Sequence, residues 1–205
     1  ELLRDESGKP ITRWDGITSK TSPITGEQVP DESAQVEQYI YRNPRKAEWP
    51  QADYIVGNPP FIGNKRMRTA LGDGYVDAVR GTWLEVPESA DFVMYWWHIA
   101  AETVRTSQVK RFGFITTNSI SQTFNRSVIQ NALDRGIGLR FVIPDHPWVD
   151  SSDGAQVRVA MSVADASQDS GRLLLSKREY ASDEDAVDVR FDVDDGVIFA
   201  DLTIG

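Results

Sequence analysis

The chain has 205 residues, of which 40% are hydrophobic and 26% charged, and its formal net charge is −9. This length suits one ordinary domain with a sizeable core, and the composition is that of a soluble globular protein. The absence of cysteine excludes a disulfide framework and a cysteine zinc site, and the lack of a long apolar run or a signal-peptide pattern is compatible with a cytoplasmic location.

The negative charge is unevenly distributed along the chain. Residues 182–201 carry eight acidic side chains and one basic one, Arg190, whereas residues 64–68 carry three basic side chains and no acidic one. A net charge of −9 argues against a domain that binds DNA phosphates on its own. An acidic scaffold with a local basic patch can still contact DNA when another domain supplies most of the affinity.

Residues 1–50 form a polar lead-in with five prolines and little hydrophobic periodicity. Within it, we predict one short helix over residues 31–41, with Asp31 or Ser33 as its N-cap. The remainder is predicted to be loop-rich, and no chemistry is assigned to it.

The stretch around Asn58 is the strongest functional signal. Residues 54–56 form an apolar, partly β-branched run of strand length. Gly57 and two consecutive prolines, Pro59 and Pro60, then break the run, because the prolines hold the backbone stiff and cannot extend a sheet. Asn58 is therefore expected at the carboxyl end of a buried strand, where the ligands of open α/β sheets gather.

Asn58 and its neighbours match the needs of a planar base that carries an exocyclic amine. The carbonyl oxygens of Asn58 and of a proline can each accept one N–H of that amine, and Phe61 offers a face for stacking. Accepting both hydrogens withdraws the nitrogen lone pair from conjugation and directs it at an electrophile, without a general base. The alternative is a Pro-Pro turn after an ordinary strand, but the strand before it and the Phe after it favour the functional interpretation.

Three cations, Lys65, Arg66 and Arg68, follow this turn within a few residues. They could contact phosphates on either side of a base that is flipped out of a duplex. They could equally form a solvated charged loop, and the sequence leaves both interpretations open. Residues 75–79 form a short amphipathic segment after these cations.

Residues 89–106 give the clearest helix, with Ser89 as a candidate cap and large apolar side chains at roughly helical spacing. Most of these side chains are expected to pack in the core. His98 has no metal-ligand spacing around it, and His146 lies in a predicted loop, so both histidines are expected to be structural.

Further strands and one helix are predicted after this segment. Residues 111–116 form a short apolar strand followed by Asn118 and Ser119, which we expect to cap a helix over 122–133 rather than to line the site. The remaining predicted strands are 140–143, ending at Pro144, its antiparallel partner 156–163, and an extension over 171–205 in which apolar and acidic residues alternate.

The order of these segments resembles that of a known enzyme family. Residues 53–61 are similar to motif IV of the N6-adenine DNA methyltransferases that use S-adenosylmethionine, and residues 57–77 resemble the methyltransferase domain of MmeI-like type IIL restriction–modification enzymes. The resemblance covers roughly residues 50–165. It includes three later segments, 90–97, 113–120 and 154–161, which are similar to motifs V, VI and VIII in that order.

The resemblance implies a bacterial adenine-specific DNA methyltransferase with a Rossmann-like α/β fold, of which this chain holds the C-terminal half of the sheet. It implies that Asn58 and Pro59 accept the N6 hydrogens of a flipped adenine, within a catalytic motif that Pro60 and Phe61 complete. Phe61 and, in a later loop, Trp148 are then expected to stack on the two faces of the base. Adenine is preferred to cytosine because cytosine-N4 enzymes more often carry Ser at the first motif position.

The resemblance also implies a cofactor site and a division into parts. Asp91 near the mouth of the site and Trp96 against the adenine of S-adenosylmethionine are the candidate cofactor residues. No Phe-x-Gly-x-Gly turn of the kind that holds this cofactor occurs before Asn58, so we expect a fragment that begins after the cofactor half. The expected parts are a lead-in over 1–50, a catalytic half over 51–165 and an acidic β-rich extension over 166–205.

Such a fragment is expected to bind the cofactor feebly, to methylate nothing alone, and to expose a sheet edge that another copy could pair with. Its parent protein is expected to bind double-stranded DNA through further domains, within a restriction–modification system. Two alternatives stay open: methylation of RNA or of a protein amide by the same fold, and a non-catalytic module that retains the fold. The basic segment after the motif and the MmeI-like context favour DNA.

Overall fold

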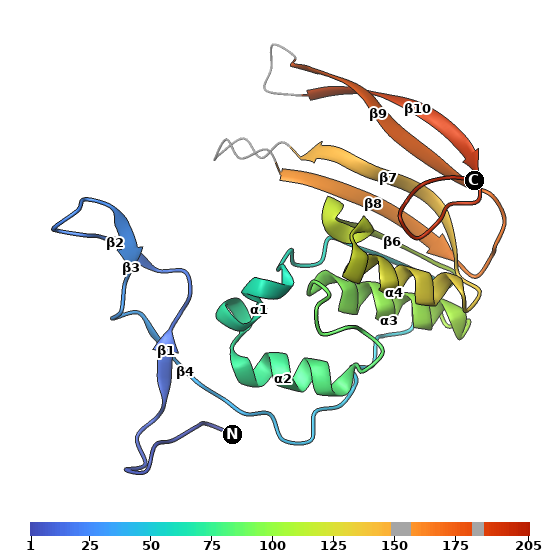
Figure 1. Ribbon diagram of the computed structural model, residues 1–205. Helices are drawn as coiled ribbons and strands as arrows, with labels where there is room; N and C mark the ends of the chain where they lie inside the picture. Colours follow the sequence, from blue (N-terminus) through green and yellow to red (C-terminus); the bar gives the residue numbers. More distant parts are fainter. Residues whose placement is uncertain (149–156, 182–186) are drawn as a thin grey trace. The chain divides into compact units, whose positions relative to one another are not determined.

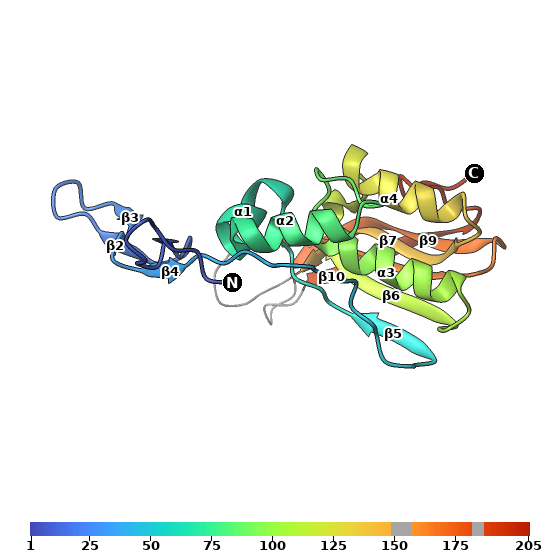
Figure 2. The ribbon, with the colours of Figure 1, turned by 90° about the horizontal axis from the view of Figure 1, so that it is seen from below.

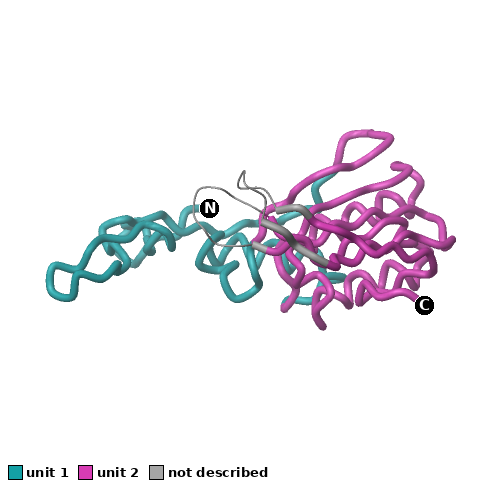
Figure 3. The backbone as a smooth tube through the Cα atoms, turned by 90° about the horizontal axis from the view of Figure 1, so that it is seen from above, with its two compact units in different colours: residues 1–48, 62–88 teal, residues 49–61, 89–205 magenta. Residues whose placement is uncertain are grey.

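The computed structural model describes residues 1–148, 157–181 and 187–205 (Figure 1). The chain divides into two compact units, which Figure 3 colours separately. Unit 1 comprises Glu1–Glu48 and Ile62–Glu88, and unit 2 comprises Trp49–Phe61 and Ser89–Gly205. The chain therefore leaves unit 2 directly after the Asn58 motif and returns to it at Ser89.

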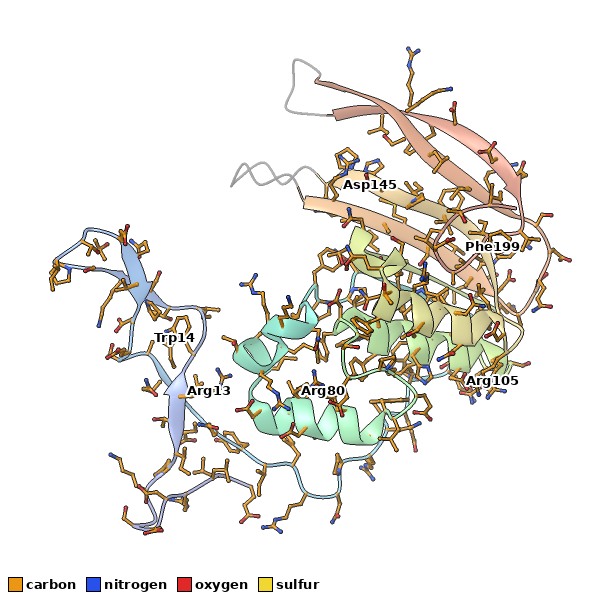
Figure 4. The ribbon with its side chains drawn as sticks, in the orientation of Figure 1. Arg13, Trp14, Arg80, Arg105, Asp145 and Phe199 are labelled. Carbon is orange, nitrogen blue, oxygen red and sulfur yellow. The ribbon has the colours of Figure 1, made fainter. Side chains whose placement is uncertain are left out.

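Unit 1 contains two short antiparallel ribbons and two helices. The Arg13 side chain, labelled in Figure 4, donates a hydrogen bond to the Thr69 carbonyl oxygen at 2.7 Å and so ties the first ribbon to the first helix. The second helix confirms the amphipathic segment predicted over 75–79. The elements are β1 (Thr12–Trp14) paired with β4 (Gln35–Glu37), β2 (Ser19–Thr21) paired with β3 (Gln28–Pro30), α1 (Asn64–Leu71) and α2 (Asp73–Thr82).

The short helix predicted over residues 31–41 is wrong, because strand β4 occupies this stretch. The Asp31 carboxylate accepts hydrogen bonds from the Ser33 N–H at 3.0 Å and from the Ser33 hydroxyl at 2.8 Å, and these bonds stabilise a turn. The next residues pair with β1, with Val36 opposite Arg13. A helix of this length is marginal without packing, so pairing with β1 prevails.

Unit 2 is built on one mixed sheet of six strands in the order β10-β9-β7-β8-β6-β5 (Figure 1). β5 runs parallel to β6, β7 runs parallel to β9, and the other neighbouring pairs are antiparallel. The strands predicted over 111–116, 156–163 and in the C-terminal extension are confirmed. The strands are β5 (Tyr54–Gly57), β6 (Arg111–Thr117), β7 (Gly138–Trp148), β8 (Val157–Asp165), β9 (Gly171–Ala181) and β10 (Val187–Gly196).

Two helices, α3 (Val93–Arg105) and α4 (Thr123–Leu133), cover one face of this sheet (Figure 2). Both confirm the predicted helices. The core lies between α3 and the sheet, where Trp97 is fully buried. The ring centre of Trp97 lies 5.1 Å from that of Phe112, and its indole N–H donates to the Ser162 hydroxyl at 3.3 Å. The large aromatic residues predicted for the core thus fix α3 onto β6 and β8.

The boundaries of two elements differ from the prediction. α3 begins at Val93 without a side-chain cap, so Ser89 does not cap it; a turn in which the Asp91 carbonyl accepts the Met94 N–H at 3.0 Å precedes the helix. β7 does not end at Pro144 but continues to Trp148. The register of β7 against β8 shifts between Ile143 and His146, and such an irregularity accommodates a residue without an N–H.

Strand β5 lies at one edge of the sheet, and its predicted burial is not observed. Tyr54 is 61% and Val56 is 87% exposed. Within the described part of the chain, β6 is the one neighbour of β5, so the outer edge of β5 presents unpaired backbone groups. A shallow apolar groove of about 370 Å³, lined in part by Ile115 and Val163, crosses β5, β6 and β8. Because side chains alternate along a strand, these two residues face away from α3.

Candidate active site

The Asn58 motif begins where β5 ends. Gly57 pairs with Phe114 of β6, and a β-carbon on Gly57 would lie only 3.3 Å from the Phe114 ring, so a small residue suits this position. Pro59 is buried, whereas Asn58 and Pro60 are exposed and Phe61 is 37% exposed. The Asn58 side chain makes no hydrogen bond to any residue that the structure describes. The segment after β5 thus presents an uncommitted amide and an accessible aromatic ring.

A hydrogen-bonded cluster around Asp91 forms the second part of the site. One carboxylate oxygen of Asp91, Oδ2, accepts hydrogen bonds from the Ser119 hydroxyl at 2.8 Å and from the Asn125 amide nitrogen at 2.7 Å. The Asp91 N–H donates to the amide oxygen of Asn125 at 2.8 Å. The Thr117 and Ser119 hydroxyls share a hydrogen bond of 2.6 Å. The cluster joins the segment before α3 to the 3₁₀ turn η1 (Asn118–Ser121) and to α4.

The topology brings Asn58 and the Asp91 cluster to the same edge of the sheet. β5 and β6 are parallel, so their carboxyl ends, Gly57 and Thr117, lie on one side. This edge is where open α/β sheets collect their ligands. Asn58 and Asp91 thus lie at the same edge of the sheet through strand order rather than through a direct contact, and their joint role in one site stays a prediction.

Sequence reasoning did not identify Asn125 and assigned Ser119 incorrectly. Ser119 was predicted to cap the helix over 122–133, but Gln122 precedes α4 without a side-chain cap, and Ser119 binds Asp91 instead. Asn125 is only 5% exposed and sits in the first turn of α4. A buried amide in a helix was the available signal, yet its partner is 34 residues away along the chain and no local pattern indicates it.

The two tryptophans predicted for the site occupy different environments. Trp96 is half-buried on α3, with its ring edge-on to Phe92 at a centroid distance of 4.4 Å. Trp148 is the last residue of β7 and 37% exposed, so it does not lie in an irregular loop. Residues 149–156, and with them residues 154–156 of the segment similar to motif VIII, lie outside the described residues. His146 stacks on Phe191 of β10 at 5.9 Å, which is a structural contact.

The three cations after the motif all lie on α1 of unit 1, but their electrostatic environments differ. Arg68 forms ion pairs with Asp73 at 3.0 Å and with Asp77 at 2.7 Å. Hydrogen bonds to Asp77 and Asp73 raise the pKa of the Arg68 guanidinium above its usual value. Lys65 and Arg66 are exposed, and neither forms an ion pair within the described part of the chain. Their charges therefore remain available to a phosphate, whereas that of Arg68 is largely balanced.

Other charges near the motif belong to the scaffold. Lys110 forms an ion pair with Asp53 at 2.8 Å just before β5, and its hydrogen bond and charge lower the pKa of the Asp53 carboxyl. Among the residues that the structure describes, no group of three His, Cys, Asp or Glu side chains is placed to hold a metal ion. No helix in the same residues is long and apolar enough to cross a bilayer.

The sequence of the chain matches a known protein family. Residues 14–175 match the family described as "MmeI, DNA-methyltransferase domain". The chain is 25% identical over 100 residues to DNA methyltransferase A of Bacillus subtilis (strain 168), an alignment that covers 48% of this chain and 11% of that protein.

A solved structure shares the fold of this chain. It is the structure of the type IIL restriction–modification enzyme MmeI in complex with DNA, with a TM-score of 0.55 and 23% sequence identity, over 74% of this chain and 20% of that one. The chain thus spans about a fifth or less of the length of these relatives. Since the family match extends over most of the sequence, the chain belongs to the MmeI DNA-methyltransferase domain family.

Proposed function

We propose that this chain is the catalytic part of an adenine-specific DNA methyltransferase that acts within a restriction–modification protein. The observation that carries the proposal is the Asn58 turn: an amide without a partner among the described residues, followed by a buried proline and an accessible Phe61, at the carboxyl end of a parallel strand. This arrangement offers two hydrogen-bond acceptors and a stacking surface to one planar base.

The proposed chemistry needs no ionisable catalyst. The Asn58 amide oxygen and the Pro59 carbonyl oxygen accept the two N6 hydrogens of a flipped adenine, while Phe61 and Trp148 stack on its faces. The N6 lone pair, turned out of conjugation by these two acceptors, would then be directed at a methyl group, which S-adenosylmethionine would supply when bound. One N6 proton then passes to solvent. The two fixed rings of Pro59 and Pro60 stiffen this segment, and such positioning of the reacting groups lowers the barrier of the step.

We propose that Asp91 and Trp96 hold part of S-adenosylmethionine, which supplies the methyl group when bound. The donor set fits this role in part, because the Asp91 carboxylate is held in one orientation by Ser119 and Asn125 and can accept hydrogen bonds from polar groups of a nucleoside. Trp96, half-buried on α3, lies edge-on to Phe92, the residue that follows Asp91. The sequence before Asn58 has no Phe-x-Gly-x-Gly turn, so binding by this chain alone is expected to be weak.

The experiment that tests the function compares two chains by calorimetry with S-adenosylmethionine. One is this chain, and the other adds about 100 residues of a mononucleotide-binding half ahead of Glu1. Binding and adenine methylation by the longer chain only, with activity lost in Asn58→Ala and retained in Asn131→Ala, would support the proposal. Asn131 is a suitable control because it is exposed on α4. Tight binding by the short chain, or methylation that survives Asn58→Ala, would contradict it.

We further propose that the parent protein acts on double-stranded DNA in the bacterial cytoplasm. Lys65 and Arg66, with their charges unbalanced, are the stronger candidates for phosphate contacts, and Arg68 is the weaker one because of its ion pairs. Methylation of RNA or of a protein amide is the alternative, and assays on these substrates with the longer chain distinguish it. No cofactor binding by either chain would favour a non-catalytic module, which the missing glycine-rich turn already suggests.

We also propose that a second copy of this chain can pair along the exposed edge of β5. Val56 is 87% exposed on that edge, and an apolar edge strand with free backbone groups promotes association. Val56→Lys should abolish concentration-dependent dimerisation in sedimentation experiments. Val193→Lys, on the opposite edge strand β10, is the control that should leave it intact. A chain that is monomeric at all concentrations would refute the pairing.

A further inference from the structure

Unit 1 contains a groove that lies outside the proposed active site. It has a volume of about 570 Å³ and runs between the extended segment 40–47 and helix α2. Its lining includes three aromatic residues, Tyr41, Tyr75 and Trp83, and two arginines, Arg42 and Arg45. We call it the unit 1 groove.

The walls of the unit 1 groove are fixed by specific contacts. The ring of Tyr41 meets that of Tyr75 edge-on at 5.8 Å. The Lys46 ammonium lies 4.5 Å from the centre of the Trp83 ring and forms an ion pair with Glu85 at 2.7 Å. These contacts hold segment 40–47 against α2 at both ends. The groove is therefore a formed surface rather than a gap beside a loose segment.

A close backbone approach adds to this constraint. A β-carbon on Gly74 would lie 1.8 Å from the Tyr39 carbonyl oxygen, so α2 and the start of the segment touch backbone to backbone. Asn43 adopts a φ of 51°, a left-handed conformation that Asn tolerates better than most residues. The turn at Asn43 places Arg42 and Arg45 on the same groove.

The charge of the unit 1 groove is incompletely balanced. Residues 42–46 carry three cations and no acid. Arg42 is paired with Glu1, and Lys46 is paired with Glu85. Arg45 forms no ion pair or hydrogen bond with any described residue, and it is exposed on the groove. Arg80 of α2, labelled in Figure 4, has other partners, because it donates hydrogen bonds to the Asn64 side chain and to the Glu88 carbonyl oxygen.

We propose that the unit 1 groove binds the sugar–phosphate backbone of double-stranded DNA, with Arg45 on a phosphate and the aromatic residues of the lining against the adjoining sugars. An unpaired guanidinium matches the geometry of a phosphate, and backbone contacts of this kind position a duplex without reading its sequence. The site lies on elements other than α1, so it adds a second point of attachment to Lys65 and Arg66. The choice of DNA as the partner rests on the proposed function.

The test is an NMR titration of the 15N-labelled chain with a 12-base-pair duplex at about 20 mM salt, where weak phosphate contacts are strongest. Amides of segment 40–47 and of α2, and the Trp83 indole N–H, should shift. Arg45→Ala should weaken the apparent affinity at least about threefold and reduce the salt dependence by about one phosphate. Lys9→Ala removes an exposed cation of unit 1 outside the groove and should change the affinity less than twofold.

Three results would overturn the proposal. The groove resonances could stay unchanged at millimolar duplex, or Arg45→Ala could behave like Lys9→Ala. Polyglutamate of equal charge could also shift the same resonances equally, which would identify a surface for acidic peptides. The dispersion of amide signals in each variant shows that it is folded. The titration contains no cofactor and reads no methyl transfer, so its failure is distinct from that of the Asn58→Ala experiment.

Discussion

Asn125 allows a direct test of how unit 2 holds the Asp91 carboxylate in place. Its side-chain amide donates to Asp91 Oδ2 at 2.7 Å and to the Ser119 carbonyl oxygen at 3.0 Å, and it accepts from the Asp91 N–H at 2.8 Å. Asn125→Ala removes these three hydrogen bonds, together with a longer one to the Ser119 hydroxyl at 3.4 Å, and leaves their partners in a site where Asn125 itself is 5% exposed. We therefore expect a large loss of stability from a small change in volume.

The size of this loss follows from the nature of the bonds. A neutral hydrogen bond contributes about 0.5–1.5 kcal/mol and a bond to a charged group about 1.5–3 kcal/mol. The three bonds share one side chain and are not additive, so the free energy of unfolding should fall by about 2–4 kcal/mol. With a urea m-value of about 2 kcal/mol/M, the unfolding midpoint would fall by about 1–2 M.

The assay is urea unfolding followed by tryptophan fluorescence. Asn131→Ala serves as the matched control, because Asn131 lies on the same helix and is exposed. Its free energy of unfolding should change by no more than about 0.5 kcal/mol, as is typical of surface substitutions. If Asn125→Ala lowers the midpoint no more than Asn131→Ala does, the cluster does not stabilise unit 2 and the reasoning is refuted.

Asn125→Asp extends the test to pH. The variant places a second carboxylate at hydrogen-bond distance from Asp91, and like charges raise the pKa of one of the two. A folded state with a raised carboxyl pKa binds more protons than the unfolded state, so its stability falls as the pH rises. The penalty relative to the unmodified chain should therefore shrink between pH 7 and pH 5. A penalty that is the same at both values would show that the two carboxylates do not face each other.

Two further predictions concern charge and backbone packing. Burial raises the pKa of the Glu102 carboxyl, but the hydrogen bond from Arg105, labelled in Figure 4, and nearby arginine charges outweigh burial and lower it. This stability is present above the unfolded pKa of about 4.3 and is lost as the pH falls through the folded value, so Glu102→Gln should reduce the drop in melting temperature between pH 7 and pH 3. In unit 1, Gly74→Ala should lower the melting temperature because its β-carbon meets the Tyr39 carbonyl oxygen. A β-carbon on Gly81, in the same helix, meets nothing within 4 Å, so Gly81→Ala should raise the melting temperature, because Ala is favoured over Gly in a helix by about 0.5–1 kcal/mol. If the two substitutions changed the melting temperature equally, the close approach at Gly74 would be refuted.

The features that sequence reasoning predicted well depend on residues close together in the chain. Three local patterns predicted elements that the structure has. They are the apolar run before Gly57, the prolines after Asn58 and the helical periodicity of α3. The position of Asn58 at a strand end needed only the order of residues 54–60. The parallel pairing of β5 with β6 then followed from the helical crossover between them.

The features that sequence reasoning missed depend on distant partners. Ser119 is a residue type that often caps helices, but its hydroxyl binds the Asp91 carboxylate, 28 residues earlier in the chain. Asp31 is a residue type that often caps helices, but its carboxylate closes a turn with Ser33, because the residues that follow this turn pair with β1. In both cases, the same side-chain chemistry satisfies two geometries, and only the tertiary structure decides between them.

The prediction that residues 54–56 form a strand is confirmed, but the prediction that this strand, β5, is buried is wrong. Residues 54–56 have the apolar, β-branched character of a central strand, yet Val56 is 87% exposed at the edge of the sheet. Free backbone groups beside apolar side chains at a sheet edge promote pairing, although the shortness of β5 limits how much of that edge is offered. The apolar groove on the helix-free face continues across the same strand. Under the proposed pairing, a second copy of the chain would contact this strand, so Val56→Lys should act on association and leave the Asn58 segment intact.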